Sequence, residues 1–221
     1  FASLVAGVPL PGFTLAPLDD PTPIVRWLRS ELDAGRVPHL WTYASSAVRI
    51  CHAARASGVD IAGARFTCGG EPTTPARRAT IEATGAGALP RMGTTETDIL
   101  AYACARPAAS DDMHFLDDRY ALIQPGPAAA RDGLPPDAMI LTSLLPTAPI
   151  LMVNVCLGDR ASVDTGVCGC PMAQEGWATR VRDVRSFEKL TAGGMTLLDV
   201  DVVRVLEEVL PGRFGGRPGD W

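Results

Sequence analysis

The feature that most constrains the fold is an alternation of helix-like and strand-like segments in the first half of the sequence. Apolar residues repeat at helical spacing in three segments that begin at Ser or Thr-Pro signals and end at glycines. The order is helix 22–35, helix 45–58, strand 61–67, a helix from 74 to Gly85 or Gly87, and strand 88–90. This order predicts an α/β layer whose strand ends carry loops.

The pattern changes after about residue 105, where short β-like runs alternate with joints rich in proline and glycine. The predicted runs are 113–116, 120–123, 138–144, 150–156 and 161–163. Their length and spacing predict a small antiparallel sheet or barrel. Near the end, Asp199 is placed to begin a helix, and we expect Pro211-Gly212 to end it.

Composition excludes several classes of protein. The 221 residues are long enough to bury a real core, and the net charge of −5 argues against nucleic acid or an anionic membrane as a partner. A run of about 20 apolar residues, which a membrane span needs, is absent from the sequence. The apolar first residues lack a basic leader, so we expect a reducing, cytoplasmic setting.

Four residues form a metal-like pattern. Cys168-Gly169-Cys170 places two thiolates on one tight turn, while Cys104 and His114 flank a loop at the change of pattern. Zn²⁺ takes four such ligands tetrahedrally, and four protein ligands leave no open position. The pattern therefore favours a structural zinc site. The alternative is that these are ordinary loop cysteines, prone to disulfide formation, beside a solvated histidine. The other three cysteines lie in apolar runs and are expected to be buried: Cys51, Cys68 and Cys156.

Three glycine-containing loops follow predicted strands. Gly69-Gly70-Glu71-Pro72 would let backbone groups approach a flat ligand edge, although taken alone it is a flexible turn. Gly93-Thr94-Thr95-Glu96 offers hydroxyl and N–H groups for phosphate and a carboxylate for Mg²⁺, although it would also suit a capped helix start. Gly158-Asp159 follows the predicted strand 150–156, and its carboxylate could accept the hydroxyls of a ribose.

The order of these loops resembles the adenylate-forming superfamily of acyl- and aryl-CoA ligases, and it is most similar to the phenylacetate–CoA ligase branch. Relatives in that branch carry a Cys…His…Cys-x-Cys zinc site, which the four residues above match in order. The resemblance runs from about His39 to Asp220. It implies the large N-terminal domain of such an enzyme, with ATP converting a carboxylic acid to an acyl-adenylate before transfer to a thiol such as CoA.

The resemblance also implies roles for single residues. Gly70, Glu71 and Pro72 would line the adenine together with Met92, which stands where the family has Tyr, and with Gly93 and Thr94. Thr95 would contact the α-phosphate, Glu96 the Mg²⁺ and Asp159 the ribose. Residues 39–46 would lie beside the acyl pocket.

Other features depart from the family pattern. Val155-Cys156-Leu157 replaces Tyr-Arg-Thr, and neither a phosphate loop with Lys nor a C-terminal domain with a catalytic Lys is present. We therefore expect this chain to be part of a longer enzyme. The alternative is a catalytically degenerate, zinc-stapled binding or scaffold module of the same fold. A zinc hydrolase is disfavoured because four protein ligands close the metal.

We accordingly expect three parts. Residues 1–105 would form an α/β subdomain with the nucleotide loops, and residues 106–185 a β-rich subdomain with the zinc site. Residues 186–221 would form a helical segment near a hinge.

Overall fold

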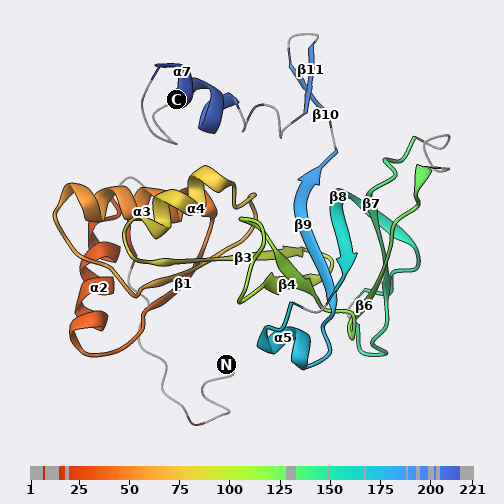
Figure 1. The fold of residues 1–221 in the computed structure, drawn as a ribbon, viewed down its shortest axis with the longest axis horizontal. Coiled ribbons are helices and arrows are strands. Elements are labelled where there is room, and N and C mark those ends of the chain that lie inside the picture. The colour runs from red at the N-terminus through yellow and green to blue at the C-terminus, as the bar shows by residue number, and fades with distance from the viewer. Residues whose placement is uncertain are drawn as a thin grey trace.

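The computed structural model divides into an α/β part and a β-rich part joined by one long strand (Figure 1). It describes residues 7, 15–17, 20–127, 133–148, 150–166, 168–187, 189–192, 195–198, 202 and 205–214. Among these, no helix is long and apolar enough to cross a bilayer.

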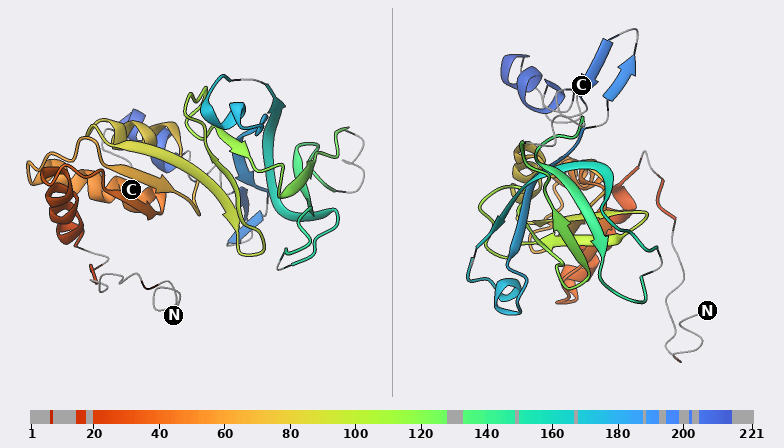
Figure 2. Two further views of the ribbon diagram at one scale, coloured as in Figure 1. Left: turned by 90° about the horizontal axis from the view of Figure 1, so that it is seen from below. Right: turned by 90° about the vertical axis from the view of Figure 1, so that its right-hand side faces the viewer.

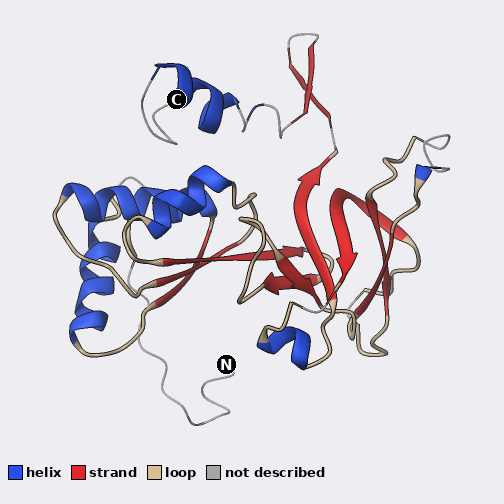
Figure 3. Cartoon of the chain, in the orientation of Figure 1, coloured by secondary structure: helices blue, strands red, loops and turns tan. Residues whose placement is uncertain are grey.

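The α/β part contains three helices, α2 (Thr22–Asp33), α3 (Ala44–Ala56) and α4 (Pro75–Glu82). They cover the parallel strands β1 (His39–Thr42), β2 (Arg65–Cys68) and the first half of β3 (Gly87–Thr94), as Figure 3 shows. Each predicted helix is therefore confirmed. The start of α4 follows the expected chemistry, because the Thr74 hydroxyl accepts a hydrogen bond from the Arg77 N–H and Pro75 occupies the first turn.

Strand β3 joins the two parts (Figure 2). Up to Pro90 it pairs in parallel with β2, and from Arg91 it pairs antiparallel with β4 (Asp98–Ala103). The register shifts between Met92 and Gly93. A Cβ atom at Gly93 would lie 2.0 Å from the carbonyl oxygen of Asp98, so this close approach of two backbones requires glycine.

The β-rich part continues the same sheet in the order β4-β5-β9-β8-β7-β6, with antiparallel neighbours throughout. Its remaining strands are β5 (Met113–Phe115), β6 (Tyr120–Ile123), β7 (Ala138–Ser143), β8 (Val155–Thr165) and β9 (Thr179–Ser186). A short helix, α5 (Pro171–Gln174), lies between β8 and β9. The mixed α/β fold with an antiparallel β-rich portion was therefore predicted correctly.

Each part has its own hydrophobic core. The first centres on Phe66 and Leu28 between the helices and the parallel strands, and the second centres on Phe115 and Met139 within the β-rich part. Ala88 belongs to the first core and Met92 to the second. The two cores thus meet along β3.

Two local predictions in the β-rich part are wrong, and so is the alternative of a helix start at Thr94. Residues 150–154 precede β8 because Asn154 adopts a left-handed backbone, with φ of 53°, and its N–H donates to the Thr142 hydroxyl. Strand β8 then runs on through residues 161–163, so Gly158-Asp159 lies inside a strand rather than in a loop after one. The Thr94 segment begins a β-turn rather than a helix, with its hydroxyl accepting from the N–H groups of Glu96 and Thr97.

The C-terminal residues also differ from expectation. A hairpin of β10 (Lys189–Ala192) and β11 (Met195–Leu198) precedes a π-helical turn, η2 (Val205–Val209), and helix α7 (Leu210–Phe214). The predicted stop at Pro211-Gly212 is wrong, because both residues lie within α7. The predicted helix start at Asp199 lies outside the described residues.

Candidate functional site

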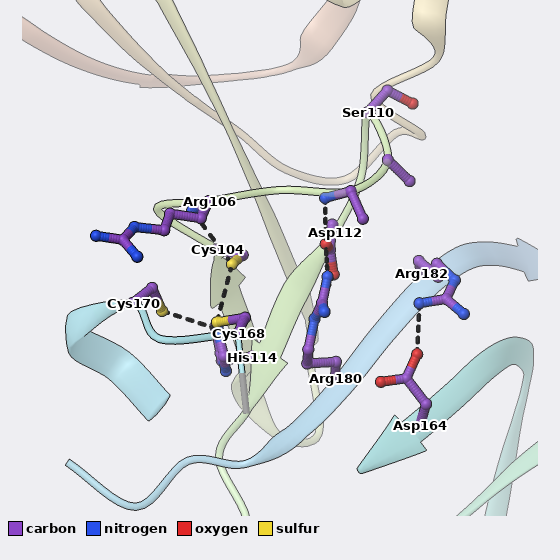
Figure 4. Close-up of polar contacts among 12 residues, drawn as sticks. Cys104, Arg106, Ser110, Asp112, His114, Asp164, Cys168, Cys170, Arg180 and Arg182 are labelled. Carbon is purple, nitrogen blue, oxygen red and sulfur yellow. Dashed lines mark hydrogen bonds and ion pairs between the residues drawn. The ribbon is translucent and has the colours of Figure 1, made fainter. Parts of the chain in front are cut away.

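Three cysteines and one histidine converge on one point, although they lie up to 66 positions apart in the sequence. Cys104 follows β4, His114 lies in β5, and Cys168 and Cys170 precede α5 (Figure 4). Their ligand atoms all lie within 4.8 Å of one another. The Nε2 atom of His114 lies 3.1 Å from the Cys170 sulfur and 3.4 Å from the Cys168 sulfur.

The imidazole of His114 is oriented by its other nitrogen. Nδ1 lies 2.7 Å from the backbone carbonyl oxygen of Trp177, and only a protonated Nδ1 can donate to it. The lone pair of Nε2 then faces the three sulfur atoms. Metal-bound histidines are oriented by the same kind of hydrogen bond, and the soft Cys₃His set suits Zn²⁺. The donor set and its geometry therefore fit the ion.

A buried ion pair supports the loop between Cys104 and His114. The Asp112 side chain is fully buried and forms a two-pronged contact with Arg180 of β9, in which the Nε–Oδ1 distance is 3.1 Å. The same carboxylate accepts from the Ala108 N–H at 2.7 Å, and the Asp112 carbonyl accepts from the Cys104 N–H at 2.9 Å. Arg78 of α4 also donates to the carbonyls of Ala109 and Ser110. The loop is thus held from β9 and from α4, and the cluster residues Cys104 and His114 lie at its two ends.

The thiols of this cluster differ in acidity. Burial raises the pKa of Cys104 to about 12. At Cys170 burial acts in the same direction, but backbone N–H donors and a hydrogen bond with Cys168 outweigh it and lower the pKa to about 6. Outside the cluster, Cys51 and Cys68 are buried, as expected, and burial raises their pKa values to about 11 and about 12. Cys156 is only partly buried.

A cavity of about 210 Å³ lies where the α/β part meets the β-rich part. It brings together six of the residues singled out from the sequence: Gly70, Glu71, Pro72, Met92, Gly93 and Asp159. These residues come from the loop after β2, from β3 and from β8. Asp159 is delivered to the cavity by β8 itself, opposite Ser186 of β9.

The loop after β2 is shaped for a close backbone approach. Gly70 has φ of +73°, and a Cβ atom there would lie 2.7 Å from the ring of Tyr43. The Glu71 carboxylate turns toward the first turn of α3, where it accepts from the N–H and hydroxyl of Ser45, and it pairs with Arg77 at 3.1 Å. Glu71 therefore anchors the loop with its side chain. It also lines the cavity, but its carboxylate is already paired with Ser45 and Arg77.

A second, larger cavity of about 500 Å³ adjoins the first. Thr94 and Thr95 line it, together with Trp41, Thr42 and Tyr43 from the segment expected beside an acyl pocket. Glu96 lines neither cavity and is exposed in the turn between β3 and β4. Every nucleotide-loop residue predicted from the sequence except Glu96 thus lines one or other of two adjoining cavities.

No family model and no curated protein matches the sequence. Among solved structures, a 2-hydroxyisobutyryl-CoA ligase in complex with R3-HIB-AMP matches with a TM-score of 0.64 and 18% identity, over 87% of this chain and 41% of that one. An anthranilate CoA ligase in complex with anthranoyl-AMP matches with a TM-score of 0.54 and 16% identity, over 88% and 38%.

The chain has the fold of part of these CoA ligases. The resemblance noted from the sequence is thereby confirmed at the level of fold, as part of the large N-terminal domain. The chain spans less than half of the length of the solved ligases that it matches.

Sequence reasoning missed three residues of the smaller cavity. Asp111 and Arg185 form an ion pair at 3.3 Å in the wall of the smaller cavity. Thr73, only 3% exposed, lines the same cavity, and its hydroxyl has no hydrogen-bond partner among the described residues. An unsatisfied buried hydroxyl costs about 1–3 kcal/mol, which a polar ligand would recover. The consecutive acids Asp111-Asp112, next to a proposed metal ligand, were the available signal.

Proposed function

We propose that this chain is part of an adenylate-forming ligase that activates a carboxylic acid with ATP. The acyl-adenylate would then pass to a thiol such as CoA. One observation carries the proposal: six residues, picked from three separate stretches of sequence for nucleotide binding, line a single cavity in a chain with the ligase fold. Both ligases compared above are described with acyl-AMP ligands, which supports the same type of ligand here.

The lining residues suggest how the two substrates would divide the space. Backbone groups of Gly70 and Pro72 and the side chain of Met92 would contact adenine, and Asp159 would accept the ribose hydroxyls. Thr95 would bind the α-phosphate from the side of the larger cavity, which would take the acid. Such a site acts mainly by positioning the two reactants and by stabilising the charge that develops on the phosphate. Glu96, which lines neither cavity, would reach Mg²⁺ only from the exposed turn.

The Cys₃His cluster would hold a structural Zn²⁺ through Cys104, His114, Cys168 and Cys170. Four protein ligands leave no coordination position for a substrate, so the ion would contribute to folding rather than to the reaction. It would tie the loop after β4 to the turn before α5, which the sequence separates by more than fifty residues.

Acid-dependent exchange of labelled pyrophosphate into ATP tests the proposal directly. We expect the full-length protein that contains this chain to catalyse exchange with at least one acid from a panel of aliphatic, hydroxy and aromatic carboxylates. Lack of exchange with every acid, together with lack of ATP binding, would remove the proposal. Asp159→Ala should reduce exchange, whereas Asp33→Ala, which removes an exposed carboxylate on α2, should not.

A second candidate is a scaffold or binding module that retains the fold and the zinc cluster without the reaction. The exposed position of Glu96 and the presence of Met92 in place of an aromatic residue favour it. Such a module would show no pyrophosphate exchange with any acid, so the same assay separates the two candidates. Tight AMP binding that Asp159→Ala abolishes would count against the module.

A further inference from the structure

Arg91 lies on the boundary between the two cavities. The residues that line both are Gly70, Arg91 and Gly93. Two of these are glycines, so Arg91 supplies the only side chain on the shared boundary. It lies in β3 at the point where pairing changes from parallel to antiparallel. A ligand that extends from one cavity into the other must therefore pass this guanidinium.

The guanidinium is held in place from two sides. Its central carbon stacks 4.7 Å from the centroid of the Trp41 ring, an arrangement typical of cation–π contact. On another side it packs over Gly69, where a Cβ atom would lie 3.2 Å from its Nε and 3.4 Å from its Nη2. These contacts position the charge without neutralising it, because neither an aromatic ring nor glycine offers an anionic acceptor.

Two acidic residues of the smaller cavity, Glu71 and Asp111, have partners of opposite charge. Glu71 pairs with Arg77, and Asp111 pairs with Arg185. Arg91, by contrast, forms no ion pair within the part of the chain that the structure describes, and its buried Nε has no hydrogen-bond acceptor there. A buried donor on a charged group without an acceptor is costly, and an anionic oxygen would relieve that cost.

We propose that Arg91 binds the anionic oxygens of the ligand at the boundary between the cavities. The inference rests on the proposed function and adds a specific residue to it. Two groups carry such oxygens there, the α-phosphate of the nucleotide and the carboxylate of the acid. Arg91 would hold one or both close to Thr95 and so bring the two reacting groups together. Its stacking on Trp41 links this anchor to the wall of the larger cavity.

The experiment compares Arg91→Gln with wild type by calorimetric titration of AMP and of adenosine, and by the Michaelis constant of the acid in pyrophosphate exchange. Arg65→Gln is the control because Arg65 is exposed on the neighbouring strand β2. A charged hydrogen bond contributes about 1.5–3 kcal/mol, which corresponds to a loss of about tenfold or more in affinity. Arg91→Lys should recover part of the loss.

If Arg91 binds the phosphate, Arg91→Gln weakens AMP and leaves adenosine unchanged. If it binds the carboxylate, AMP and adenosine are unchanged and the Michaelis constant of the acid rises by a similar factor. Equal weakening of AMP and adenosine, or no change in any of the three quantities, would overturn the proposal. Wild-type protein that binds neither AMP nor adenosine would instead contradict the proposed function itself.

Discussion

Met113 and His114, consecutive residues of β5, serve the two sites of the molecule. Met113 lines the smaller cavity, and His114 belongs to the Cys₃His cluster. Successive side chains of a strand point to opposite faces, so the cluster and the cavity lie back to back across one strand. The loop that precedes β5 reinforces this link, because it starts at the cluster residue Cys104 and carries Asp111 into the cavity wall.

The first prediction concerns the cysteines. Structural zinc contributes on the order of 10 kcal/mol of apparent binding energy to folding, so Cys168→Ser should remove a large part of the free energy of unfolding. Cys51→Ser should cost far less, because it alters a buried thiol that lies outside the cluster and accepts a hydrogen bond from the Thr84 hydroxyl. Urea unfolding of both variants measures the difference. Equal losses, or purified protein without zinc by elemental analysis, would point to ordinary core cysteines.

The second prediction links the metal to the nucleotide. Removing zinc should free the loop that carries Asp111 and thereby weaken AMP binding. Calorimetric titration of AMP before and after chelation, followed by return of zinc, measures the effect. In Cys168→Ser, chelation should produce no further change in AMP affinity. Unaltered AMP affinity in the folded, zinc-free protein would show that cluster and cavity act independently.

The third prediction compares two ion pairs on β9. Asp112 is fully buried, so Asp112→Asn leaves the charge of Arg180 without a partner and should lower the free energy of unfolding by about 3–5 kcal/mol. Asp164→Asn is the matched control, because its pair with Arg182 is partly exposed and should contribute only about 0–1 kcal/mol. Denaturant titration of the two variants checks the contrast, and similar losses in both would refute it.

The fourth prediction tests the approach of β3 and β4. In Gly93→Ala the new Cβ would meet the Asp98 carbonyl at 2.0 Å, so the strands must separate. We expect a loss of about 1–3 kcal/mol in the free energy of unfolding, accompanied by weaker AMP binding. Gly87→Ala, on the same strand, has its nearest contact at 3.9 Å and should change neither quantity appreciably.

Much of the α/β part was predictable because its signals are local. Thr74 and Pro75 mark the start of α4 through their own chemistry, and the apolar spacing of α3 indicates its buried face. The convergence of Cys104, His114, Cys168 and Cys170 was also predictable, since Cys and His residues are few and these four lie near a change in sequence pattern, whereas the zinc itself stays a prediction. Their convergence depends on β5 and β9 pairing over a long sequence separation.

Other features depend on tertiary contacts that the sequence does not display. Strand β9 carries three arginines, and the acids that pair with them, Asp112, Asp164 and Asp111, lie 18 to 74 positions away in the sequence. The position of Asp159 inside β8 arises because Asn154 turns the chain before the strand begins. The position of the Arg91 guanidinium depends on the Trp41 ring and Gly69, which only the folded chain brings beside it. The division into parts at residues 105 and 185 stays a prediction.

The central claim is that the cavity between the two parts binds an adenine nucleotide. Calorimetric titration of AMP into the purified protein, its Asp159→Ala variant and its Asp33→Ala control tests it most directly. The account predicts saturable binding to wild type and control, with a loss of about tenfold or more in Asp159→Ala. Absence of AMP binding to the folded, zinc-loaded wild-type protein, or equal affinity in all three proteins, would contradict it.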